Sequence, residues 1–241
     1  MSSPSAGPVL VGAAHGTRNP AGVVATRALL DAVRAARPGL VARECFVDVH
    51  GPTPEEVLAD VDAPSVLLPL LLSVGYHVGV DLPRAAATAR HPVVVGESLG
   101  PDEALVAVLT DRLAEAGVVS DELSESDDVV LAAAGSSDPA SAAAVEEVAA
   151  GLAARLRHPV RPAYSSAVSP RVPCAVARGR IEGRRVVVAT YLLAPGLFTR
   201  RAEMSGADVV APPLGVHPRL VELVLRRYDE AAARLPVATG P

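Results

Sequence analysis

The hydrophobic pattern of the first half of the chain alternates between short apolar runs and segments of helical periodicity. The apolar runs predict buried strands, at 8–14, 40–49, 64–74 and 91–96. The segments that follow them predict helices, at 21–37, 54–61, 81–90 and 101–117. The apolar runs are nearly continuous rather than alternating, which is typical of parallel strands covered by helices on both faces. We therefore expect an α/β fold built on a parallel sheet.

The same pattern restarts after an acidic polar segment, GVVSDELSESDD at 117–128. The second half repeats the first with offsets of 119 residues (His15 to Ala134), 121 residues (Gly75 to Gly196) and 115 residues (Gly100 to Gly215). Two copies at so long a period indicate two duplicated domains rather than a solenoid. We expect an N-terminal domain at 1–118, a linker at 119–128 and a C-terminal domain at 129–241, each with a small parallel sheet flanked by helices.

Composition narrows the classes of protein. The 241 residues are 50% hydrophobic, lysine is absent and the net charge is -5, so we expect no nucleic-acid partner. Cys45 and Cys174 are far apart in sequence and form no CxxC, which argues against a structural zinc site and an Fe–S cluster. Neither a GxGxxG motif nor a P-loop occurs, so we expect no nucleotide cofactor. Without a signal-peptide pattern or a membrane-spanning apolar run, we expect a cytoplasmic monomer that does not contact the membrane.

Histidines mark the ends of the predicted strands. His15 follows the first strand, His50 the second and His77 the third, so all three belong to the carboxyl edge, where open parallel sheets bind ligands. His91 and His158 precede strands and belong to the opposite edge, where we expect them to be structural or solvated.

Two imidazoles at one edge suit a particular chemistry. Neutral imidazole binds Fe²⁺, Co²⁺, Ni²⁺ or Zn²⁺, and an unperturbed histidine takes up a proton near its pKa of about 6.5. An enzyme that inserts a metal into a tetrapyrrole needs both properties. Asp48, at the end of the second strand, is a candidate for a nearby carboxylate.

Several motifs carry a resemblance to a known family. His15-Gly16-Thr17-Arg18, Gly75-Tyr76-His77-Val78 followed by Asp81-Leu82-Pro83, Leu99-Gly100-Pro101-Asp102, and Cys45-Phe46-Val47-Asp48 with Pro52-Thr53 resemble signatures of the sirohydrochlorin chelatases (CbiX/SirB type). The resemblance covers essentially the whole chain and is to the two-domain form.

The resemblance implies a chelatase-like, flavodoxin-like fold in both domains and insertion of Fe²⁺ or Co²⁺, with Ni²⁺ as a further possibility, into sirohydrochlorin without ATP. It implies that His15 and His77 are catalytic and bind the metal with Asp48, which stands where relatives often have glutamate. Substrate-binding residues on this basis are Thr17, Arg18, Gly75, Tyr76 and Arg84. The C-terminal domain has Ala134 and Phe198 at the positions of the two histidines and cannot supply the metal pair.

Two alternatives remain open on the sequence. One is a metal or tetrapyrrole carrier on the same fold, without catalysis. The other is a serine hydrolase, because Gly96-Glu97-Ser98-Leu99-Gly100 fits the GxSxG nucleophile elbow. An elbow serine directly opens its helix, whereas Pro101 is expected at the first helical position, after Ser98. The repeated turn in the second half keeps Leu214-Gly215 but has no such serine.

Overall fold

The computed structural model describes residues 7–73, 75 and 77–236, without the side chain of His77. Its contacts divide the chain into two compact units, neither of which is one continuous segment. Unit 1 contains the described residues of Met1–Leu71, Tyr76–Leu99 and Val221–Pro241. Unit 2 contains those of Leu72–Gly75 and Gly100–Leu220.

Unit 1 is a parallel four-stranded sheet in the order β2-β1-β3-β4. Leu10 of β1 lies opposite Ala42 of β2 and Val66 of β3. Its elements are β1 (Val9–Ala14), α1 (Pro20–Ala36), β2 (Ala42–Phe46), α2 (Pro54–Ala59), β3 (Ser65–Pro69), the short π-helical turn η1 (His77–Asp81), α3 (Leu82–Ala86), β4 (Val93–Val95) and α8 (Pro218–Ala232), the last from Val221 onward.

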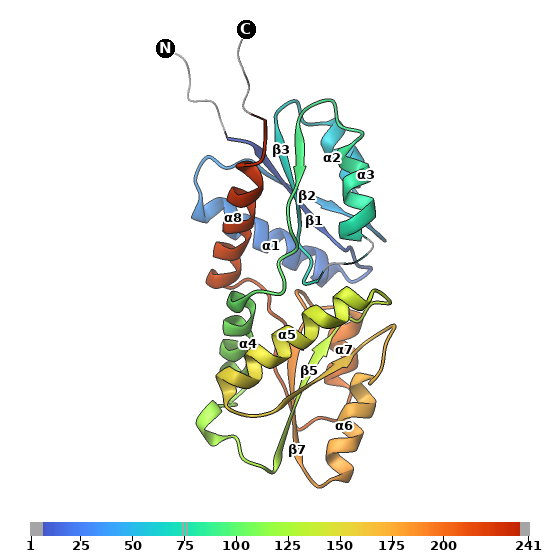
Figure 1. The fold of residues 1–241 in the computed structure, drawn as a ribbon, viewed down its shortest axis with the longest axis vertical. Coiled ribbons are helices and arrows are strands. Elements are labelled where there is room, and N and C mark those ends of the chain that lie inside the picture. Colours follow the sequence, from blue (N-terminus) through green and yellow to red (C-terminus); the bar gives the residue numbers. More distant parts are fainter. Residues whose placement is uncertain (1–6, 74, 76, 237–241) are drawn as a thin grey trace. The chain divides into compact units, whose positions relative to one another are not determined.

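Helices cover both faces of this sheet, as the continuous apolar runs predict. One face packs on α2 and α3 through a cluster that includes Val11, Val57 and Leu82. On the other face, Ala14 and Phe46 pack on Val23 of α1. Figure 1 shows α1 and α8 on the side of this sheet away from α2 and α3. The carboxyl ends of the strands are left for the connecting loops.

Unit 2 has the same topology, with the parallel order β6-β5-β7-β8. Val129 of β5 lies opposite Val160 of β6 and Val187 of β7. Its elements are α4 (Glu103–Glu115), the 3₁₀ turn η2 (Ser120–Glu122), β5 (Asp127–Ala133), α5 (Pro139–Leu156), β6 (Val160–Tyr164), α6 (Val172–Ile181), β7 (Arg185–Tyr191), α7 (Leu197–Glu203) and β8 (Val209–Val210). In Figure 1, α4 and α5 lie on one side of the sheet and α6 and α7 on the other. The predicted fold class, two parallel sheets flanked by helices, is confirmed.

The third predicted strand is too long. The apolar run at 64–74 predicts one strand, but β3 ends at Pro69 and the segment Leu72–Gly75 belongs to unit 2. Leu70 still donates its backbone N–H to Ala13, at 2.8 Å, before the chain leaves the sheet. Hydrophobicity does not determine conformation, so an apolar, partly buried loop that continues a buried strand has the sequence pattern of a strand. His77 therefore begins η1 instead of ending a strand directly.

The last helix of each half lies in the unit built mainly from the other half. Helix α4 belongs to unit 2, and α8 from Val221 onward belongs to unit 1. The boundaries expected at 118 and 129 describe the duplicated sequence and stay a prediction, because the compact units divide the chain elsewhere. An amphipathic pattern shows that a helix has a buried face but not which sheet that face covers.

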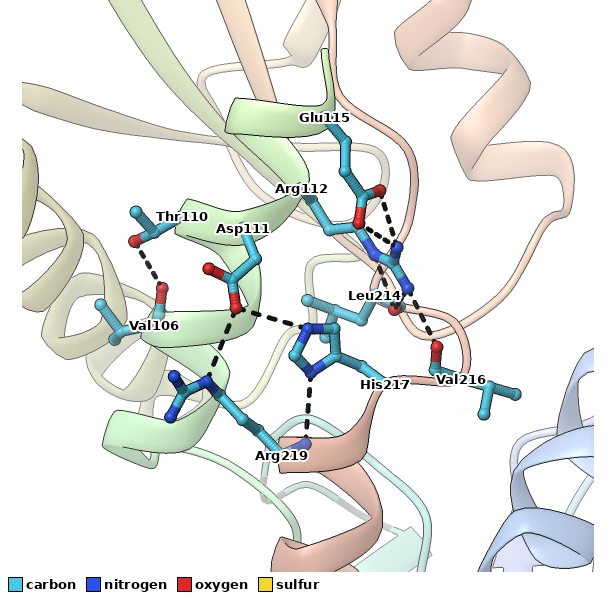
Figure 2. A network of polar contacts seen from close by, with 9 residues as sticks. All are labelled: Val106, Thr110, Asp111, Arg112, Glu115, Leu214, Val216, His217 and Arg219. Carbon is cyan, nitrogen blue, oxygen red and sulfur yellow. Dashed lines mark hydrogen bonds and ion pairs between the residues drawn. The ribbon is translucent and has the colours of Figure 1, made fainter. Parts of the chain in front are cut away.

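A polar network on α4 fixes the chain just before α8 (Figure 2). Arg112 donates to the carbonyl of Leu214, at 2.7 and 3.0 Å, and to that of Val216, at 3.1 Å. Asp111 contacts His217, at 3.3 Å. The Nδ1 atom of His217 accepts the backbone N–H of Arg219, at 3.2 Å, as an N-cap does.

Candidate active site

The loop after β1 presents His15 at the carboxyl edge of the unit 1 sheet. His15 and Arg18 are both exposed. Asn19 is the N-cap of α1: its side chain accepts the N–H of Ala21, at 3.0 Å, and Thr17 Oγ1 accepts the N–H of Asn19, at 3.0 Å. Thr17 is thus engaged in shaping this loop, between the exposed His15 and Arg18.

A close backbone approach joins the end of β1 to the end of β2. Gly16 has φ +93°, and a Cβ atom there would lie 1.9 Å from the carbonyl oxygen of Asp48. The N–H of Asp48 donates to the carbonyl of His15, at 3.0 Å. Glycine is required by both its left-handed conformation and the lack of space. The structure therefore places His15 and Asp48 on neighbouring strand ends.

The Asp48 carboxylate is turned toward its own loop. Its Oδ1 accepts the N–H of Val49, at 2.7 Å, and its carbonyl accepts the N–H of His50, at 2.7 Å. The ring of His50 lies 4.9 Å from that of Phe46, centroid to centroid. Asp48 and His50 are both exposed, in the loop that hydrogen-bonds to the backbone of His15.

The equivalent loop of unit 2 keeps the geometry and has lost these groups. Gly135 has φ +85°, and a Cβ there would lie 2.1 Å from the carbonyl oxygen of Ser166. The N–H of Ser166 donates to the carbonyl of Ala134, at 2.9 Å. The turn therefore forms with alanine in place of His15 and serine in place of Asp48. Neither side chain is required by the fold, which favours a chemical role for both.

The second motif is described in part. Gly75 belongs to unit 2, Tyr76 lies outside the described residues, and of His77 only the backbone is described, in η1. Arg84 is exposed and pairs with Asp81, at 3.2 Å. The pairing of His15 with His77 thus stays a prediction. Within the described part of the chain, no cluster of three or more His, Cys, Asp or Glu side chains is arranged to hold a metal ion.

The remaining histidines of the sequence prediction have structural contacts. A ring nitrogen of His91 lies 3.0 Å from the hydroxyl of Ser65, and His158 lies 2.9 Å from the carbonyl of Ser124. Both are near the amino ends of strands, as expected.

Burial raises the pKa of the Cys45 thiol, and the negative charges of Glu55 and Glu44 raise it further. This cysteine therefore stays protonated and is a poor metal ligand.

The nucleophile-elbow motif does not have elbow geometry. Ser98 is buried, and α4 begins only at Glu103. The N-cap is Asp102, which accepts the N–H of Ala104 at 2.9 Å, so the expectation of Pro101 at the first helical position is wrong. An elbow serine is exposed and opens its helix, and Ser98 does neither.

An aromatic and cationic pair lies at the start of α7 in unit 2. The Arg201 guanidinium stands 5.6 Å from the centre of the Phe198 ring and donates to the carbonyl of Ser165, at 2.9 Å. Leu197 and Arg200 beside them are exposed. Arg201 thus supports the end of β6 as well as offering positive charge at the surface.

These features define a class: a duplicated parallel α/β protein with imidazole and carboxylate side chains at the carboxyl edge of one sheet. The CbiX family model matches residues 9–116 and 128–231, and the chain belongs to this family. No curated protein sequence matches it. In the part of the chain that the structure describes, no helix has the length and apolar character to cross a membrane.

Solved structures share the fold over nearly the whole chain. SirB from Bacillus subtilis with Fe³⁺ is 25% identical, with a TM-score of 0.76 over 94% of this chain and 96% of that one. The sirohydrochlorin chelatase SirB from Bacillus subtilis subspecies spizizenii in complex with cobalt is 21% identical, with a TM-score of 0.72 over 94% and 96%. CbiX, the terminal enzyme of siroheme biosynthesis in denitrifying bacteria, is 20% identical, with a TM-score of 0.68 over 92% and 99%.

Proposed function

We propose that this protein is a chelatase that inserts Fe²⁺ or Co²⁺ into sirohydrochlorin. The observation that carries the proposal is the likeness, over almost all of both chains, to an iron-containing SirB within the CbiX family. We further propose that it acts without a nucleotide or an Fe–S cluster, as a cytoplasmic monomer. Ni²⁺ is a third metal to be tested.

The reaction replaces both pyrrole N–H protons of the macrocycle by one divalent metal, so the site must deliver a cation and remove protons. In our proposal His15 and His77 bind the metal through neutral imidazole nitrogens and take up the departing protons. The unit 2 loop supports this role for His15, because the same turn forms around Ala134.

The carboxylate and the arginines have separate roles in the proposal. Asp48 attracts the metal from the neighbouring strand end and shares the proton load. We expect Asp48→Glu to keep activity, because it keeps a carboxylate on a longer side chain. Asp48→Asn removes the negative charge and should lower kcat by about tenfold or more. Arg18 and Arg84 pair with substrate carboxylates, for which guanidinium offers bidentate hydrogen bonds, and Thr17, Gly75 and Tyr76 line the substrate.

The test compares edge histidines with the structural ones. His15→Ala and His77→Ala are each expected to abolish metal insertion into sirohydrochlorin, followed by absorbance under anaerobic conditions. His91→Ala and His158→Ala are matched controls, because they remove imidazoles from the other edge, and should retain the wild-type rate. Wild-type rates in both His15→Ala and His77→Ala would refute the proposed site.

The same assay separates a chelatase from a carrier and ranks the metals. Many product molecules per protein are expected, whereas a carrier stops at one. Competition among Fe²⁺, Co²⁺ and Ni²⁺ at equal concentration then identifies the preferred metal, which imidazole and carboxylate ligands alone do not determine.

A further inference from the structure

The segment that leads into His77 is held by unit 2. Leu72–Gly75 belongs to unit 2 although β3 before it and η1 after it belong to unit 1. The Tyr191 hydroxyl donates to the carbonyl of Leu72, at 2.8 Å, and the Ser141 hydroxyl donates to the Ser73 hydroxyl, at 3.0 Å. Four residues after Ser73, the chain reaches His77.

Tyr191 is a rigid and permanent donor. It is the last residue of β7 and only 2% exposed, so its ring is fixed by the sheet. Burial raises the pKa of its phenol, and Asp102 and Glu147 raise it further, so the hydroxyl stays protonated and able to donate. Ser141 lies in the first turn of α5 and is also buried.

Gly100 makes room for this hydrogen bond. A Cβ at Gly100 would lie 2.4 Å from both the Leu72 carbonyl oxygen and the Tyr191 hydroxyl. The adjoining Leu99 donates its N–H to the carbonyl of Leu71, at 2.8 Å. The glycine of the Leu-Gly-Pro-Asp motif is therefore explained by the place where the segment is anchored.

The anchoring groups are specific to one copy of the duplication. By the repeat offsets, Tyr191 corresponds to Leu70, Ser141 to Gly22 and Ser73 to Ala194, none of which carries a hydroxyl. The loop of the second half, which carries Phe198 instead of a histidine, thus lacks these hydrogen-bonding groups. The two units share one topology, so the fold does not account for this difference in hydroxyl groups. Among the described residues, the hydroxyls donate to the loop that leads to His77 and not to the loop that leads to Phe198.

We propose that Tyr191 and Ser141 are positioning residues for His77: they hold Leu72 and Ser73, from which the chain continues to His77. The inference rests on the proposed function and gives a role to two buried hydroxyls in the half that has Phe198 at the position of His77. A displacement of about 1 Å in a reacting group can reduce a rate by about 100-fold. We therefore expect two hydrogen bonds that hold the chain four and five residues before His77 to affect the rate of metal insertion.

The test is Tyr191→Phe with Tyr228→Phe as the matched control. Tyr228 is also a buried tyrosine whose hydroxyl donates to a backbone carbonyl, that of Pro8, at 2.6 Å; Pro8 precedes β1 and so lies at the opposite end of that strand from His15. We expect Tyr191→Phe to lower kcat and the affinity of the free protein for Co²⁺ about tenfold, with KM for sirohydrochlorin within about twofold. The visible Co²⁺ spectrum should change in Tyr191→Phe and not in Tyr228→Phe.

Ser141 supplies an independent test if Tyr191→Phe folds poorly. Ser141→Ala should weaken Co²⁺ binding, Ser141→Thr should restore it by returning a hydroxyl, and adding Ser73→Ala to Ser141→Ala should cause no further loss. Co²⁺ affinity and spectrum equal to wild type in both Tyr191→Phe and Ser141→Ala would overturn the inference. Failure of the wild-type protein to insert Fe²⁺, Co²⁺ or Ni²⁺ into sirohydrochlorin would instead overturn the proposed function, so the two failures are distinguishable.

Discussion

At the scale of single residues, the loop that carries His15 depends on one glycine. Gly16 combines φ +93° with a Cβ position 1.9 Å from a backbone oxygen. We predict that Gly16→Ala destabilises the protein by several times the cost of Gly39→Ala and abolishes metal insertion. Gly39 has φ +89° but nothing within 4 Å of its Cβ position, so it reports the left-handed strain alone, about 1 kcal/mol. Urea denaturation and the insertion assay measure both.

Gly135→Ala is a control that lowers stability without changing the loop that carries His15. A Cβ at Gly135 would lie 2.1 Å from the carbonyl oxygen of Ser166, in the equivalent loop of unit 2. Folded Gly135→Ala protein should therefore still insert metal. Equal urea midpoints for Gly16→Ala and Gly39→Ala would show that the strand ends do not constrain each other.

Strand order along the sequence predicts which residues lie at the carboxyl edge of the sheet, but not the contacts that they make there. His15 and Asp48 could be assigned to one edge because parallel strands end there together. The orientation of the Asp48 carboxylate toward Val49 could not be predicted. It accompanies a left-handed conformation of Val49, with φ +64°, which no local sequence pattern indicates. The role inferred for Tyr191 could not either, since its partner Leu72 lies 119 residues away in the chain.

At the scale of helices and strands, local signals were reliable and partner choice was not. Asn19 and Asp138 each cap a helix that proline opens, as the sequence indicates. The segment 70–75 looked like strand because its residues are apolar, yet β3 ends at Pro69. Two of the differences between the predicted and the observed elements, this strand end and the helix start at Pro101, occur near Leu72 and Gly100, where the chain passes between units.

Arg112 of α4 is predicted to stabilise the stretch before α8 (Figure 2). Arg112→Met keeps the side-chain stem but leaves the carbonyls of Leu214 and Val216 without their guanidinium donor. We expect a loss of about 2 kcal/mol, measured by urea denaturation. Arg178→Met is the control, because Arg178 is 68% exposed and forms an i,i+4 pair with Glu182, for which little loss is expected. Similar losses in both variants would contradict the prediction.

The start of β5 is predicted to lose stability in acid. Burial raises the pKa of Asp127, but hydrogen bonds from the backbone and hydroxyl of Ser124 and from Arg185 lower it more, leaving it below its ordinary value. A depressed carboxyl pKa adds stability above the unfolded-state pKa of about 3.9, and this is lost as pH falls through the folded value.

Asp127→Asn should therefore be less stable than wild type at pH 7, and the difference should shrink as the pH falls below about 4. Urea midpoints measured from pH 7 to strongly acidic pH give the comparison. Asp121→Asn, an exposed carboxylate in the preceding turn, is the control and should change little. A difference between Asp127→Asn and wild type that is constant across this range would contradict the linkage.

At the scale of the whole molecule, the exchange of last helices makes each half depend on the other. A fragment of residues 1–118 carries α4, whose buried residues Leu105, Val108, Leu109 and Leu113 belong to unit 2. It lacks α8, which supplies unit 1 with Leu223, Val224, Tyr228 and Ala231. Full burial of one such aliphatic or aromatic side chain stabilises by about 1.5–3 kcal/mol, so both defects are large compared with the stability of a domain of this size.

We predict that the fragment 1–118 does not fold cooperatively alone and that co-expression with 119–241 restores a folded, active complex. Thermal unfolding followed by circular dichroism measures the first, and co-purification with Co²⁺ insertion the second. The control is the full chain cut after folding at a protease site between Asp121 and Glu122, which should stay associated and active. A sharp unfolding transition in the isolated 1–118 fragment would show that unit 1 needs no helix from the second half, and the duplication would then be two independent domains joined by a linker.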